Sequence, residues 1–140
     1  MISRQTPSAY SVITNPPRLL ITDDDRDIRE TLGSIFAPRG FRTLLASDGK
    51  EALDIVQREQ VHVVLIDMHM PRMTGLEMIR QVKRTHAVMP CILISAALDE
   101  DLAEEARRAQ VFSQLAKPIS LLDVTSIVGA AMRQTYGWPA

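Results

Sequence analysis

The feature that most constrains the fold is a regular alternation between short apolar runs and amphipathic helical patterns. The runs that we expect to form strands are residues 19–22, 42–46, 61–66, 91–95 and a weaker one at 112–116. Between them, apolar residues recur at helical spacing, as at Ile28, Leu32, Ile35 and Phe36. Strands that alternate with helices form a parallel sheet with helices on both faces and right-handed crossovers. The chain is therefore expected to be an α/β protein with five strands and five helices.

Polar residues mark where several of these helices begin. Asp48, followed three residues later by Glu51, predicts a start that resembles a capping box. Ser120 and Asp123 have the same spacing and predict the start of the final helix, which is expected to run to about Met132.

Length and charge limit the function classes. The 140 residues, of which 46% are hydrophobic and 24% charged, suit one globular domain. We expect this domain at residues 18–134, between a flexible leader at 1–17 and a short tail at 135–140. The net charge of −1 argues against direct nucleic-acid binding. No stretch approaches the ~20 apolar residues that cross a bilayer. Cys91 is the only cysteine and is expected in the core, which suits a reducing, cytoplasmic location.

Charged residues follow three of the predicted strands. Asp23 and Asp24 come directly after the first apolar run, Asp67 ends the third, and Lys117 follows the fifth. Ligands of an open α/β sheet bind at the carboxyl ends of its strands, so these groups should meet there. Helix capping is the plainer explanation for the run that ends at Asp25. However, two like charges ~4 Å apart repel by ~4 kcal/mol at an effective dielectric constant of 20. A compensating hard cation such as Mg²⁺, which prefers oxygen ligands, is therefore expected.

Asp67 is the most specific candidate. An acid at the end of four large aliphatic residues is costly to bury unless it is paired or functional, although it could also form an ordinary strand-end turn. A carboxylate can act as a nucleophile and form an aspartyl phosphate. Phosphoryl transfer needs mainly positioning and charge neutralisation, for which Ser95 offers a hydroxyl and Lys117 a positive charge.

Four segments, taken together, resemble the receiver domain of two-component response regulators. They are LLITDDDRDIRETL at residues 19–32, VVLIDMHMPRMTGLEMIRQVK at 63–83, CILISA at 91–96 and LAKPIS at 115–120. The resemblance covers residues 18 to about 132, with the segments in the family's order and spacing. It implies a flavodoxin-like, doubly wound fold whose five parallel strands have the order 2-1-3-4-5.

The resemblance also implies a metal site. Asp67 would be the phosphorylated residue and a ligand of Mg²⁺. Asp24 would bind the ion directly, Asp23 mainly through water, and the backbone carbonyl of His69 would be a further ligand.

Around the phosphoryl group, the resemblance implies a hydrogen bond from Ser95, an ion pair with Lys117 and a cis peptide bond between Lys117 and Pro118. One position departs from the family pattern, because Gln114 stands where the family commonly has Tyr or Phe. The chemistry does not need that ring, but its usual coupling to the neighbouring helices is in doubt. Phe112 shares the strand parity of Gln114 and is expected in the core.

The leading hypothesis is a regulatory phosphoacceptor that catalyses only its own phosphorylation and dephosphorylation. Its partners would be a sensor histidine kinase or a histidine phosphotransfer protein, and a downstream protein target. A phosphohydrolase of the haloacid-dehalogenase type is an alternative, but it requires a second Asp where His69 stands. A flavin or nucleotide carrier of similar fold is a third hypothesis, and the sequence has no glycine-rich phosphate loop to support it.

Overall fold

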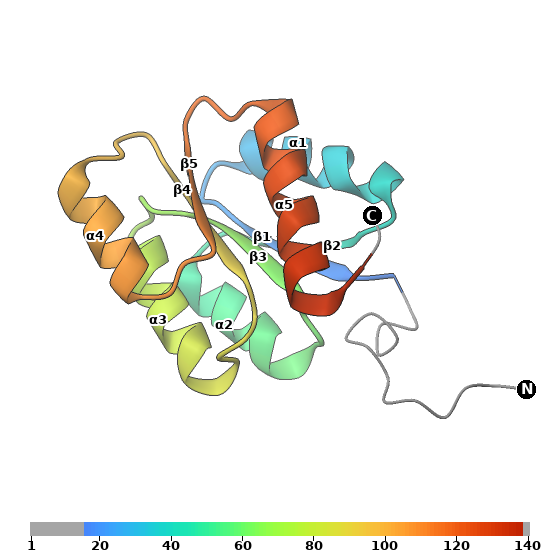
Figure 1. The fold of residues 1–140 in the computed structure, drawn as a ribbon, viewed down its shortest axis with the longest axis horizontal. Helices are drawn as coiled ribbons and strands as arrows, with labels where there is room; N and C mark the ends of the chain where they lie inside the picture. Colours follow the sequence, from blue (N-terminus) through green and yellow to red (C-terminus); the bar gives the residue numbers. More distant parts are fainter. Residues whose placement is uncertain (1–15, 139–140) are drawn as a thin grey trace, which may run out of the picture.

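Five parallel strands form one sheet in the order β2-β1-β3-β4-β5, which confirms the predicted order (Figure 1). The computed structural model describes residues 16–138, so most of the predicted leader and the last two residues of the predicted tail lie outside the described residues. The strands are β1 (Arg18–Thr22), β2 (Arg42–Ala46), β3 (Val63–Asp67), β4 (Cys91–Ser95) and β5 (Ser113–Ala116).

Helices cover both faces of the sheet. One face carries α1 (Arg26–Phe36) and α5 (Leu121–Tyr136), and a short 3-10 helix, η2 (Ala37–Arg39), follows α1. The other face carries α2 (Gly49–Arg58), α3 (Gly75–Thr85) and α4 (Glu100–Arg108). Five α-helices therefore alternate with the strands along residues 16–138, as predicted.

The central strands are apolar because both of their faces are covered. Every residue of β3 and β4 is buried, including Cys91. In β1, Leu19 and Ile21 pack with α1 and α5, whereas Leu20 packs on the opposite side. The edge strand β5 is shorter and only half-buried, as its weaker apolar pattern indicated.

Side chains cap the helices close to where the sequence predicts. Asp25, Asp48 and Ser120 each accept hydrogen bonds from the first turn of the helix that follows. A full capping box joins Thr74 and Glu77 at the start of α3. This last cap was not predicted, although its Thr-x-x-Glu pattern is readable in the sequence.

Two element boundaries differ from the prediction. Strand β3 begins at Val63 rather than at residue 61. Just before it, the backbone N–H of His62 donates to the carbonyl of Arg18, and the N–H of Arg18 donates to the side-chain Nδ1 atom of His62. Helix α5 continues to Tyr136, past the predicted end at Met132, so the predicted tail begins inside this helix. No helix in the described part of the chain combines the length and apolar character needed to span a membrane.

Candidate functional site

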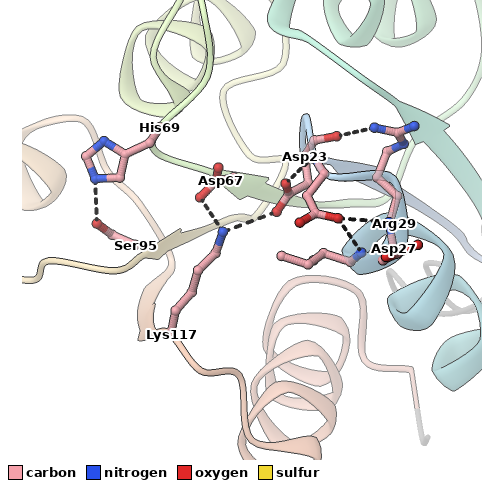
Figure 2. A network of polar contacts seen from close by, with 9 residues as sticks. Asp23, Asp27, Arg29, Asp67, His69, Ser95 and Lys117 are labelled. Atoms are coloured by element: carbon pink, nitrogen blue, oxygen red, sulfur yellow. Dashed lines mark hydrogen bonds and ion pairs between the residues drawn. The ribbon is translucent and has the colours of Figure 1, made fainter.

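The carboxyl ends of four strands bring the candidate residues to one edge of the sheet. Asp23 follows β1, Asp67 ends β3, Ser95 ends β4 and Lys117 follows β5 (Figure 2). The peptide bond between Lys117 and Pro118 is cis, as the resemblance implied.

Three carboxylates converge at this edge. Asp23, Asp24 and Asp67 each offer an oxygen, and these oxygens all lie within 4.8 Å of one another. The side chains of Asp23 and Asp67 are almost fully buried, whereas Asp24 is exposed. Because buried like charges repel strongly and lose their hydration, such a cluster needs positive charge beside it.

Lys117 supplies part of that charge. Its Nζ atom lies 3.1 Å from Oδ1 of Asp67 and 3.5 Å from Oδ2 of Asp23. Neither of these buried oxygens accepts a well-aligned hydrogen bond from any described residue. One ammonium beside three carboxylates leaves the cluster short of positive charge.

The pKa values of Asp23 and Lys117 reflect this shortage of positive charge. Burial raises the pKa of Asp23, and Asp67 and Asp24 add to the effect, while the backbone N–H of Asp25 and the ammonium of Lys117 oppose it. Burial alone would lower the pKa of Lys117, but its contacts with Asp67 and Asp23 outweigh burial and raise it. The pKa of Asp23 therefore rises because this carboxylate is desolvated among like charges, whereas the pKa of Lys117 rises because its ammonium contacts two carboxylates.

The donor set fits a hard divalent cation. All three converging side chains offer oxygen, and the orphaned oxygens of Asp23 and Asp67 are available as ligands. His69, whose carbonyl is the fourth predicted ligand, lies in the loop directly after Asp67. These residues could therefore hold Mg²⁺.

Ser95 and His69 meet on the other side of Asp67. The hydroxyl of Ser95 is fully buried, and its Oγ atom lies 3.4 Å from Nε2 of the exposed His69 ring (Figure 2). Oγ of Ser95 also contacts both backbone polar groups of Ala97 at 3.2 Å. The hydroxyl is thus held at the end of β4, next to the strand that carries Asp67.

Backbone contacts that the sequence did not reveal hold the acids in place. Arg29 donates a hydrogen bond from Nη1 to the carbonyl of Asp23 at 2.7 Å, and the N–H of Asp25 donates to Oδ1 of Asp23 at 2.8 Å. Gly75 lies so close to Asp67 that a Cβ atom there would be 2.4 Å from the carbonyl oxygen of Asp67. The only sequence signal for this approach was a glycine at the first position of a helix.

Comparison with known proteins gives consistent matches. The family described as the response regulator receiver domain matches residues 19–129. The response regulator MprA of Mycolicibacterium vanbaalenii is 33% identical over 120 residues, which are 86% of this chain and 52% of MprA. The sporulation initiation phosphotransferase F of Bacillus subtilis is 32% identical over 111 residues, 79% of this chain and 90% of that protein. The chain thus spans about half the length of MprA but most of the phosphotransferase.

Solved structures agree with this assignment. A response regulator receiver domain protein from Clostridium thermocellum has 26% identity and a TM-score of 0.79, covering 84% of this chain and 95% of that one. The receiver domain of the Francisella response regulator 1452 has 28% identity and the same TM-score. The match covers 85% of this chain and 98% of that one. A CheY-like receiver domain protein from Methanospirillum hungatei, at 21% identity and a TM-score of 0.82, shows the common fold.

Proposed function

Because the chain belongs to the response regulator receiver domain family of two-component systems, we propose that it is a phosphoacceptor whose phosphorylated residue is Asp67. The observation that carries the proposal is the buried carboxylate of Asp67, which faces Lys117 beside a cluster of oxygen ligands. The donor is a phosphohistidine on a partner protein, and the reaction depends on Mg²⁺.

In the proposed reaction, a carboxylate oxygen of Asp67 attacks the phosphorus atom. The bond between phosphorus and the donor histidine nitrogen breaks, and that nitrogen keeps the electron pair. Bound Mg²⁺ would supply charge neutralisation for the transferred group, held by Asp23, Asp24, Asp67 and the carbonyl of His69.

Two further side chains then stabilise the product. The ammonium of Lys117 already lies 3.1 Å from Asp67, so it needs only a short movement to pair with the phosphoryl oxygens. The hydroxyl of Ser95, at the end of the adjacent strand, donates a hydrogen bond to the same group. These new contacts exist only after phosphorylation and can bias a conformational equilibrium.

We further propose where the phosphohistidine protein docks. A groove of about 470 Å³ runs from Lys117 along α1 and the start of α5 and is lined mainly by apolar groups, among them Ile28, Ile35 and Pro118. Leu121, which also lines it, is 53% exposed. An apolar groove that begins at the reactive edge suits a helix of a histidine kinase or phosphotransfer protein. A downstream protein would recognise the phosphorylated form.

One relative, the sporulation initiation phosphotransferase F, supports a relay role in particular. This chain spans 90% of the phosphotransferase from Bacillus subtilis, so the matched region makes up most of that protein. A regulatory output is favoured over a phosphohydrolase, because the position two residues after Asp67 holds His69 and not a second carboxylate.

Phosphorylation with a small donor tests the proposal. Incubation with acetyl phosphate and Mg²⁺ is expected to add the mass of one phosphoryl group, and the Asp67→Asn variant is expected to add none. Asp48→Asn is the matched control, because Asp48 caps α2 outside the site and asparagine is an equally good cap. Equal phosphoryl uptake by the Asp67→Asn variant and the wild type would contradict the proposal.

A further inference from the structure

The hydroxyl of Ser95 has no hydrogen-bonding capacity left in this structure. Its Oγ atom donates to the carbonyl of Ala97 at 3.2 Å and accepts the N–H of Ala97 at 3.2 Å. A hydroxyl has one proton and two lone pairs, so one acceptor position remains. Nε2 of His69, 3.4 Å away, occupies that position (Figure 2). Because the only proton of Ser95 already serves Ala97, the imidazole must donate from its Nε2–H group.

The contact between His69 and Ser95 joins two neighbouring segments at the candidate site. His69 is exposed in the loop that follows Asp67, and among residues 16–138 its side chain makes no other hydrogen bond. Ser95, by contrast, is fully buried at the end of β4. The N–H of Met68 donates to the carbonyl of Ile94 at 2.7 Å, so the backbone also holds these two segments side by side. The His69 ring therefore reaches Ser95 from a loop whose position is fixed by the sheet.

A phosphoryl group on Asp67 would compete for this hydroxyl. To donate to a phosphoryl oxygen, Ser95 must withdraw its proton from the carbonyl of Ala97, because the hydroxyl has no second proton to offer. A change to another staggered rotamer also displaces Oγ from the His69 ring. The distance of 3.4 Å between Oγ and Nε2 is already at the long end of the hydrogen-bond range, so this contact is lost on rotation. The contact with His69 thus belongs to the unphosphorylated state.

From this use of a single hydroxyl, we propose that His69 is a positioning residue that holds Ser95 in its unphosphorylated conformation. The inference rests on the proposed phosphorylation of Asp67. The imidazole stabilises the state in which Ser95 is turned to Ala97, so the phosphoryl group must displace it before Ser95 can bind. One neutral hydrogen bond shifts an equilibrium by about twofold to tenfold. The side chain of His69 therefore weakens binding of the phosphoryl group by this factor, while its carbonyl stays available as the proposed metal ligand.

Titration with beryllofluoride, a phosphoryl mimic, in the presence of Mg²⁺ measures this effect through the amide NMR signals. His69→Leu removes the donor but keeps a side chain of similar bulk, and should tighten beryllofluoride binding about threefold to tenfold. His69→Gln returns an N–H group at the reach of Nε2 and should reverse most of this gain. In the Ser95→Ala background, His69→Leu should change the affinity by less than about 1.5-fold, because the hydroxyl that the ring contacts is gone.

The imidazole nitrogen signals of His69 give a second readout. In the unphosphorylated protein they should report a proton on Nε2 and should move in the Ser95→Ala variant, and beryllofluoride should move them in the same direction in the wild type. A purely structural role of His69 would not link these signals to Ser95. Equal affinities of the His69→Leu variant and the wild type, or an equal gain in the Ser95→Ala background, would overturn the inference while phosphorylation of Asp67 stood. A wild type that binds no beryllofluoride and takes up no phosphoryl group from acetyl phosphate would overturn both.

Discussion

Gly75 holds the loop of the candidate site by having no side chain. An added Cβ would lie 2.4 Å from the carbonyl oxygen of Asp67 and 3.0 Å from Cα of Met68, and these backbone atoms cannot rotate away. We therefore expect Gly75→Ala to destabilise the fold by roughly 1–3 kcal/mol, as overpacking does, and to reduce phosphoryl uptake. Urea denaturation and the acetyl phosphate assay measure these two effects.

Gly33 provides the matched substitution. It lies inside α1, where an added Cβ would make only ordinary contacts at 3.8 Å. Gly33→Ala should leave phosphorylation unchanged and stabilise the fold by up to ~1 kcal/mol, because alanine favours helix. Similar losses of stability in both alanine variants would contradict the close-approach argument.

The neighbouring acids Asp24 and Asp25 should have separable roles. Asp24 is exposed and belongs to the oxygen cluster, whereas Asp25 caps α1 by accepting the N–H groups of Asp27 and Ile28. We expect Asp24→Ala to weaken Mg²⁺ binding in a titration with little loss of stability. Asp25→Ala should instead cost about 1 kcal/mol of stability and largely keep Mg²⁺ affinity. If the two variants lose metal affinity equally, the acids act together as caps or as ligands, and the division is wrong.

At the scale of elements, His62 joins β1, β3 and α5. Its Nδ1 atom accepts the N–H of Arg18 at 2.9 Å, and its carbonyl accepts the hydroxyl of Tyr136 at 2.8 Å. Burial lowers the pKa of His62, and the charge of Arg18 lowers it further. The unfolded chain therefore takes up this proton more readily than the folded one, so the stabilisation is present above pH 6.5 and is lost as the pH falls below that value.

The His62→Asn variant measures this contribution. Asparagine can accept the N–H of Arg18 through its side-chain oxygen but does not titrate. We expect the unfolding free energy of the wild type to fall more steeply between pH 7 and pH 5 than that of the variant. Denaturant titrations across this range measure both slopes. Parallel slopes would show that protonation of His62 does not affect stability.

His62 and Tyr136 also show why the element boundaries could be predicted only in part. Run length, helical spacing and strand-end polarity are local, so the five strands, five helices and their order followed from sequence and resemblance. Just before β3, the side chain of His62 accepts the N–H of Arg18 from across the sheet. At the end of α5, Gly137 is a local stop signal, but the hydroxyl of Tyr136 also donates to the carbonyl of His62, 74 residues away in the sequence. Neither contact is visible in a local pattern.

At the candidate site, too, some features could be predicted from the sequence and others depend on contacts in the folded chain. Topology alone predicts that residues at strand ends will meet, which is why Asp23, Asp67, Ser95 and Lys117 could be chosen from the sequence. Burial of Asp23 but not Asp24, and the backbone support from Arg29, depend on distances in the folded chain. These features required the structure.

Across the whole molecule, the groove that begins at Lys117 lies on the face covered by α1 and α5. The surface formed by α4 and β5 lies on another side of the molecule and is less well buried against the core. Gln114 on β5 pairs with Leu93 in the sheet register and is only half-buried, and α4 contributes one buried helical residue, Ala106. Phe112 packs with the core near α5, as predicted. The α4–β5 surface therefore offers no aromatic ring at Gln114 to carry a change from the phosphoryl group.

We therefore expect phosphorylation to produce small changes on this side of the molecule. A ligand shifts a two-state equilibrium only by its differential affinity, and moving from 1:99 to 99:1 takes ~5.5 kcal/mol. Contacts of the phosphoryl group with Ser95 and Lys117 are the proposed source of that energy. With no rotating ring at Gln114, little of it should reach α4 or the start of α5.

Amide NMR shifts with and without beryllofluoride, a phosphoryl mimic, measure the spread of the change. Shifts should be large around Asp67, Ser95 and Lys117 and small over residues 99–110 and 120–132. The Asp67→Asn variant, which should not bind the mimic, controls for nonspecific effects. Gln114→Tyr supplies the missing ring and should enlarge the shifts on α4. Large shifts there in the wild type would mean that the change is transmitted without the aromatic ring, and the prediction would be wrong while the chemistry at Asp67 remained possible.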